Sequence, residues 1–154
     1  MNVDEREPFV NVRFRVEIEG LQDTGAVEVI FPDARIVPGR RRRQAIEYGH
    51  LTLRRGVTTS GAWYQWWDRA RGSAALPKKR VVVVLMDRTG ADVNRWTFPE
   101  ASPVAYSVSP LNALGAAPLI ETLELSVGGF SAAFGRASNE SGTRLSRRQV
   151  SRQA

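Results

Sequence analysis

Two segments of the chain alternate strictly between apolar and polar residues. The first is FVNVRFRVEIE at 9–19, and the second is IETLELSV at 120–127. Successive side chains of a β-strand point to opposite faces, so this period of two predicts half-buried strands of an antiparallel sheet. The predicted polar faces carry Arg13, Arg15, Glu17 and Glu19 in the first strand and Thr122, Glu124 and Ser126 in the second. The predicted buried faces carry Val10, Val12, Phe14, Val16 and Ile18, and Glu121, Leu123, Leu125 and Val127.

One segment has helical spacing instead. Trp63, Trp66, Trp67 and Ala70 fall at i, i+3, i+4 and i+7, which predicts a short helix with its tryptophan stripe pressed onto an apolar surface. Thr58, Thr59 and Ser60 offer an N-cap, and Gly72 suits the C-terminal end. Three tryptophans on a short helix most often cover a core.

The remaining chain predicts further strands joined by turns. We expect strands at 26–31, 46–54, 81–86 and 93–98, with a short one at 104–108. The segment 81–86 is apolar on both faces, so it should be central in the sheet. Residues 32–45 are expected to form an exposed loop with a Pro-Gly turn at 38–39, and 99–118 to be irregular with a turn of helix near 110–113. The fold class is therefore mainly β, an antiparallel sheet with one short α-helix.

Composition limits the organisation of the chain. Its 154 residues suit one domain, which we place at 9–135 between an N-terminal arm at 1–8 and a Ser/Arg-rich tail at 136–154. Cysteine is absent, so disulfides and thiolate metal sites are excluded. The longest apolar run is far shorter than the roughly 20 residues that span a bilayer, and the polar start predicts no export signal. We therefore expect no membrane anchor and assembly in the cytoplasm.

Positive charge is concentrated in two places. The net charge is +6, but the tail carries five arginines and one glutamate, so the rest of the chain is near +2. The second cluster is the run Arg40, Arg41, Arg42 and Arg43. A basic β-domain that binds nucleic acid is therefore an alternative function, although the aromatic residues are not interleaved with either cluster.

Residues that could carry chemistry are few. His50 is the only histidine, and it lies within an alternating strand, where a plain structural position is the stronger interpretation. The glutamates on the predicted strands lack a marked acid or base partner, and no phosphate-binding glycine motif occurs. We expect neither an enzyme nor a bound cofactor or metal.

Four blocks of sequence, taken in order, resemble the tail-tube protein family of contractile phage tails and related contractile injection systems. They are FRVEIEGL at 14–21, IEYGHLTLRRGVT at 46–58, the tryptophan helix at 63–72, and the long stretch 81–127 with its D-x-x-G turn and the segment RWTFPEASPVAYSVSPLNALGAAPLIETLEL. Together they cover about residues 9–134. No enzyme motif competes with this resemblance.

The resemblance implies a structural subunit. In that family, subunits form six-membered rings whose strands join into one ring-shaped β-barrel, and the rings stack into a hollow tube inside a sheath. The implied partners are further copies of the chain, the sheath protein, baseplate or spike proteins and tube-terminating proteins, with cargo in the lumen. The resemblance implies that the assembled particle is a phage virion or an injection particle, and it allows release of that particle from the cell. A tube-initiator or baseplate paralogue is the alternative within the family.

The resemblance also gives the residues expected roles. The polar faces should line the lumen, through Arg13, Arg15, Glu17, Glu19, Thr122, Glu124 and Ser126. The helix packs outside the barrel, with Trp63, Trp66 and Trp67 on its packing or sheath side. The loop with Arg40, Arg41, Arg42 and Arg43 should contact the next ring.

Overall fold

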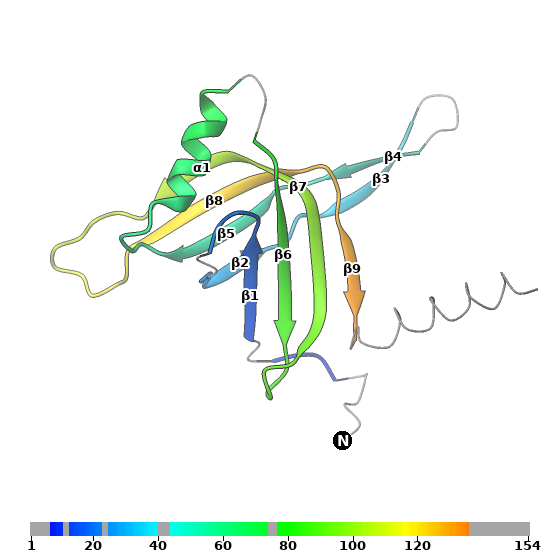
Figure 1. Cartoon of the computed structure of the whole chain (residues 1–154), viewed down its shortest axis with the longest axis horizontal. Helices are drawn as coiled ribbons and strands as arrows, with labels where there is room; N and C mark the ends of the chain where they lie inside the picture. Colours follow the sequence, from blue (N-terminus) through cyan, green and yellow to red (C-terminus); the bar gives the residue numbers. More distant parts are fainter. Residues whose placement is uncertain (1–6, 11–12, 23–24, 40–43, 74–76, 136–154) are drawn as a thin grey trace, which may run out of the picture.

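The computed structural model describes residues 7–10, 13–22, 25–39, 44–73 and 77–135. Within them lie one helix, α1 (Ala62–Arg71), and nine strands (Figure 1). The strands are β1 (Arg13–Ile18), β2 (Glu28–Ile30), β3 (Ala34–Pro38), β4 (Gln44–Tyr48), β5 (Leu51–Gly56), β6 (Lys79–Met86), β7 (Asp92–Val108), β8 (Ile120–Val127) and β9 (Ser131–Phe134). The expected fold class, mainly β with one short helix, is confirmed.

Seven strands form one antiparallel sheet that curls around the core. Its order is β1-β6-β7-β8-β5-β2, and β9 pairs with β7 beside β8. In Figure 1 the strands β1, β6 and β9 and one part of β7 lie upright on the page, whereas β8 and β5 cross it diagonally. The curl follows from β7, which is long enough to belong to both parts.

Strand β6 is central, as its two apolar faces predict. Val81, Val82, Val83, Val84 and Leu85 are all buried. β1 pairs with one side of β6 in a register that sets Val16 opposite Val83, and β7 pairs with the other side. A strand covered on both faces needs apolar residues at every position.

Strand β7 corrects the prediction of an irregular segment at 99–118. It is continuous from Asp92 to Val108, and the two prolines within it lie at irregularities of the pairing. The register with β6 shifts near Pro99, and the register with β8 shifts between Pro103 and Ala105. A proline is tolerated in a sheet where a bulge removes the need for its missing N–H. No helical turn forms at 110–113; the N–H of Gly115 instead donates to the Asn112 carbonyl at 3.1 Å.

Strand β9 was not predicted. It continues the pairing of β8 along β7, with Ala101 opposite Val127 and Thr97 opposite Ser131. The sequence SAAF has no alternation of polar and apolar residues. Pairing with β7 forms this strand where its own pattern gives no signal.

The predicted loop at 32–45 is wrong at 34–38 and 44–45, which lie in strands. β3 and β4 form a two-stranded hairpin with Ile36 opposite Ile46, and it projects away from the sheet in Figure 1. The predicted strand at 46–54 is divided into β4 and β5 at Gly49 and His50. At this break the Gly49 N–H donates to the Asp33 carbonyl at 2.9 Å, and a Cβ there would lie only 2.3 Å from the Asp33 carboxylate.

The predicted first two strands are also longer than those found. Residues 9–10 are exposed and outside β1, residues 11–12 lie outside the described part, and β2 covers only three residues. The boundaries predicted for the arm at 1–8 and the tail at 136–154 fall mostly on residues that the structure does not describe, so they stay a prediction.

The helix closes one end of the core. Trp63, Trp66 and Ala70 are buried, and the indole N–H of Trp66 donates to the Pro77 carbonyl at 2.9 Å. The helix ends at Gly72 as predicted, but its N-cap is Gly61, which has no capping side chain. Thr58 instead accepts a hydrogen bond from the Ser60 N–H at 3.2 Å, in a turn before the helix.

Candidate functional site

The polar side of the curled sheet is the surface that the predicted lumen residues share. In the cross-strand register Arg15 is opposite Val84 and Glu17 opposite Val82, whereas Val16 is opposite the core residue Val83. On β8, burial alternates at every residue, with Leu123 fully buried and its neighbours half-exposed. The predicted lumen residues of β1 and β8 therefore point away from the core, whereas Glu121 of β8 points into it.

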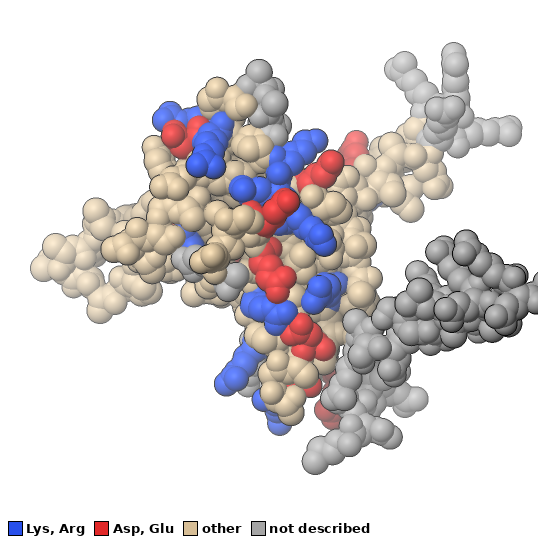
Figure 2. Space-filling model, viewed as in Figure 1, with Lys and Arg blue, Asp and Glu red and all other residues tan. Residues whose placement is uncertain are grey.

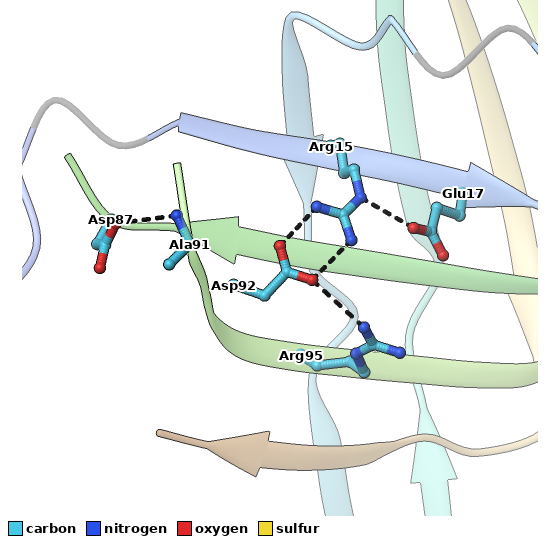
Figure 3. Close-up of polar contacts among 6 residues, drawn as sticks. All are labelled: Arg15, Glu17, Asp87, Ala91, Asp92 and Arg95. Carbon is cyan, nitrogen blue, oxygen red and sulfur yellow. Dashed lines mark hydrogen bonds and ion pairs between the residues drawn. The ribbon is translucent and has the colours of Figure 1, made fainter. Parts of the chain in front are cut away.

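Four charged side chains on this side form one network across β1, β6 and β7 (Figure 3). Both terminal nitrogens of Arg15 donate to the two Asp92 carboxylate oxygens, at 2.6 and 2.8 Å, and Arg15 Nε donates to Glu17 Oε1 at 2.8 Å. Arg95 lies 3.6 Å from the same Asp92 carboxylate. The bidentate geometry is the favourable one for an arginine and a carboxylate.

The network bridges β6 from β1 to β7. Arg15 starts on β1 and ends at Asp92 on β7, while its cross-strand neighbour Val84 on β6 is fully buried although it lies on the polar side. The aliphatic part of an arginine side chain covers apolar surface while its head stays in contact with water. Hydrogen bonding to Arg15 lowers the pKa of Asp92 below its ordinary value of 3.8, and the same pair raises the pKa of Arg15.

The predicted residues on β8 belong to the other half of the sheet. Thr122 is opposite Arg54 on β5 and Glu124 is opposite Thr52. Glu124 Oε1 contacts His50 Nδ1 at 2.5 Å, and Arg54 donates to Glu28 at 2.8 Å. Positive and negative groups are paired here as well, so neither half is a surface of one sign.

Glu19, at the end of β1, accepts the Arg80 backbone N–H at 3.0 Å.

Figure 2 shows this mixture of signs directly. Lysine and arginine side chains alternate with aspartate and glutamate along a band through the middle of the visible face. A polyanion such as nucleic acid needs a patch or stripe of positive charge. The described part of this face lacks such a stripe, and the predicted cluster Arg40–Arg43 lies outside the described residues.

A buried ion pair beneath the helix was not predicted as such. The side chains of Arg55 and Glu121 are 2% and 4% exposed. Arg55 Nε donates a hydrogen bond to Glu121 Oε1. The Tyr106 hydroxyl donates to Glu121 at 2.6 Å, and the Arg55 guanidinium lies 4.3 Å from the Trp63 ring centre. Burial and the adjacent carboxylate raise the pKa of Tyr106 to about 12.

The sequence did contain a signal for this pair. Glu121 shares the alternating face of Leu123 and Leu125, and Arg55 shares that of Leu51 and Leu53. Opposite charges on the apolar faces of two strands indicate that they pair in the core. The alternation placed Glu121 on the buried face of its strand, but Glu121 was grouped with the other strand glutamates and its partner Arg55 was missed.

The tryptophans of α1 divide between core and surface. Trp63 and Trp66 are buried, which confirms the helix as a cover of the core, while Trp67 is half-buried and its ring centre lies 6.3 Å from that of Tyr106. Tyr64 is 44% exposed, and its ring centre lies 5.6 Å from that of Tyr106.

Within the described ranges, no three His, Asp or Glu side chains are grouped so as to hold a metal ion. His50 is half-exposed and contacts Glu124. None of the helices in these ranges is long and apolar enough to cross a membrane.

Comparison with known protein families identifies the family of the chain. The family model described as "T4-like virus tail tube protein gp19" matches residues 10–131. The chain belongs to the tail tube family. No curated protein sequence matches the chain.

Solved structures share the tail tube fold. A chain of the sheath/tube terminator of an extracellular contractile injection system, PVC, has a TM-score of 0.64 and 16% identity, over 84% of this chain and 99% of that one. A chain of the anti-feeding prophage baseplate has a TM-score of 0.60 and 22% identity, over 83% and 97%. Hcp1 from Flavobacterium johnsoniae has a TM-score of 0.61 and 20% identity, over 79% and 95%. The family match explains why the predicted blocks occur in one order: they are the strands and helix of a tail tube domain.

Proposed function

We propose that the protein is the repeating subunit of the inner tube of a contractile tail or contractile injection system. Copies assemble as hexameric rings, rings stack into a hollow tube, and the tube is surrounded by a sheath and bounded by baseplate, spike and terminating proteins. The work of the protein is mechanical, and it has no catalytic role. The particle that contains it is a phage virion or an injection particle.

The observation that carries this proposal is that two terminal strands of a sheet of tail tube fold, β1 and β9, can pair with each other between copies; β2 is a third terminal strand. β1 ends the sheet on one side, and β9 pairs only with β7 among the described strands. β7 runs parallel to β1, because both are antiparallel to β6, so β9 runs antiparallel to β1. Joining β9 of one copy to β1 of the next therefore continues an antiparallel sheet without a break.

Such a join also pairs backbone groups that stay unpaired in an isolated copy. An open strand edge presents unpaired N–H and C=O groups, and a closed barrel removes them. Because every copy carries both edges, the contact is heterologous and closes into a ring when its rotation divides a full turn. In this ring the sheet formed by β1, β6, β7 and β9 is the wall.

The lumen residues divide between the two halves of the curled sheet. We propose that the polar side of the wall, with Arg13, Arg15, Glu17 and Glu19, faces the lumen. The half of the sheet that curls away from the wall contains β8, with Thr122, Glu124 and Ser126. We propose separately that these three residues face the lumen, and this proposal has its own test. The run Arg40–Arg43 follows β3 and precedes β4 in the sequence, outside the described residues, and we propose that it contacts the next ring.

Negative-stain electron microscopy of the purified chain tests the tube function. Six-fold rings or stacked tubes are expected, and a variant without residues 136–154 shows whether the tail limits stacking. A monodisperse monomer in both forms would contradict the proposal.

A tube-initiator or baseplate role is the second candidate. It is favoured by the match to a chain of a baseplate, which covers 97% of that chain. An initiator is expected to form a single ring that does not stack, so the same images separate the two roles. The paired charges of the sheet give no support to the alternative that the protein binds nucleic acid. Salt-sensitive binding of DNA by the chain without residues 136–154 would favour that alternative.

A further inference from the structure

The connection between β7 and β8 is an uncharged loop with two exposed leucines. Residues 109–119, SPLNALGAAPL, contain no charged side chain, and Leu111 and Leu114 are 85% and 99% exposed. In Figure 1 the loop projects from the sheet at the left, and in Figure 2 this projection is entirely tan. Leucines so fully exposed on a projecting segment point to a surface that a partner covers.

The loop has a defined shape. At its base the Ser109 N–H donates to the Ile120 carbonyl at 2.8 Å, and the Ile120 N–H donates to Ser109 Oγ at 2.8 Å. At its tip the Asn112 side chain accepts the Leu114 N–H at 3.1 Å. The two leucines are thus presented by a loop whose backbone is held at both places, which reduces the ordering cost of binding.

An exposed aromatic cluster lies on the opposite side of the molecule. Trp96 contacts Phe31 with ring centres 4.9 Å apart and Phe134 with ring centres 5.7 Å apart. Phe31 is 43% exposed and Phe134 is 71% exposed. Phe134 ends β9, the edge strand at the right of Figure 1, whereas the leucine loop lies beyond β1 at the left.

We propose that the leucine loop 109–119 of one copy docks on the aromatic cluster Phe31, Trp96 and Phe134 of the neighbouring copy in the same ring. The inference rests on the proposed tube function, because joining β9 of one copy to β1 of the next brings these two flanks together. Both surfaces are apolar, so the contact buries no unpaired charge. A loop and three aromatic side chains cover less than the roughly 1,000 Å² that an independent interface needs. The docking therefore supports the pairing of β9 with β1 of the next copy and does not replace it.

Cysteine cross-linking tests the contact directly, because the chain has no cysteine of its own. The double variant Leu114→Cys/Phe134→Cys is assembled and treated with a short bis-maleimide. Docking in a ring predicts covalent ladders from dimer to closed hexamer, whereas each single variant gives at most dimers. Rings that form but yield no ladder would overturn the docking and leave the tube function standing. Failure of the wild-type chain to form rings would instead contradict the tube function.

A second measurement asks whether the contact contributes to assembly. Burial of two leucines favours association strongly enough that L111S/L114S should raise the protein concentration needed for rings by more than about tenfold. Ala117→Ser in the same loop and Ala133→Ser on β9 are the controls and should assemble like the wild type. Both leucines are exposed, so circular dichroism should show an unchanged fold. Rings at the wild-type concentration from L111S/L114S would overturn the proposal.

Discussion

Glu121→Ala tests the buried ion pair beneath the helix. The substitution leaves the Arg55 guanidinium, 2% exposed, without its carboxylate, and removes the acceptor of the Tyr106 hydroxyl. Breaking a buried pair by removing one partner costs about 3–5 kcal/mol. Domains are stable by only about 5–15 kcal/mol, so this variant should lose a large part of its free energy of unfolding.

The measurement is urea denaturation at a concentration where the chain is monomeric. With a slope of about 1–3 kcal/mol/M, the midpoint should fall by at least about 1 M. Glu17→Ala is the matched control, because it removes another arginine–glutamate pair, with side chains 32% and 44% exposed. Exposed pairs contribute about 0–1 kcal/mol, so this variant should keep nearly the wild-type midpoint.

Two results would refute the reasoning. Equal midpoints for the two variants would show that burial of the pair does not determine its contribution. The double variant Arg55→Met/Glu121→Leu removes both charges, and it should be more stable than Glu121→Ala because no unpaired charge remains in the core. A double variant that is less stable than the single one would contradict the same argument.

Three further predictions follow from the sheet. Leu123→Arg should abolish folding and Thr122→Arg should not, because only Leu123 is fully buried; circular dichroism that fails to separate them would contradict the assignment of faces. The pKa of Asp92 is lowered, so its pair with Arg15 stabilises the fold at neutral pH and loses this effect as the pH falls below 3.8. The difference in free energy of unfolding between the wild type and Asp92→Asn should therefore shrink as acid is added. A difference that stays constant would argue against the pair. In an ultraviolet titration compared with Tyr106→Phe, Tyr106 should ionise near pH 12. Because the pKa of Tyr106 is raised in the fold, the free energy of unfolding should decrease as the pH rises above 10. Ionisation at pH 10 would mean that the site is open to water.

Lumen exposure can be tested separately for the two halves of the sheet. Glu17→Cys and Thr122→Cys are placed in assembled tubes and exposed to maleimides of increasing size. A position in the lumen should react with small maleimides and be protected from large ones attached to a polymer, whereas an outer position should react with both. Reaction of Glu17→Cys with large reagents in intact tubes would contradict the proposed wall.

The strands with the clearest alternation could be predicted from the sequence because local pattern and burial agree there. β8 has the predicted bounds, and the central position of β6 follows from its two apolar faces. The tryptophan spacing identified α1 for the same reason. In these elements the side chains that determine the pattern are also the ones that form the core.

The elements that were missed depend on partners rather than on their own pattern. β9 exists because β7 offers an edge, and β7 continues past Pro99 and Pro103 because bulges accommodate them. The hairpin β3–β4 has exposed residues on both faces, so burial leaves no signal in its sequence. Propensity alone is a weak guide for such strands.

The candidate site was predictable in part. Alternation on β1 and β8 correctly gave the side of the sheet, but it could not show that Arg15 reaches Asp92 across β6. That contact joins residues 77 positions apart in the chain and depends on the order of the strands.

A cryo-EM reconstruction of assembled tubes would test the central claim most directly. We predict six copies per ring, with β9 of one copy paired to β1 of the next and the Arg15 network facing the axis. A ring closed through other strand edges, or one in which Arg15 faces outward, would contradict the account.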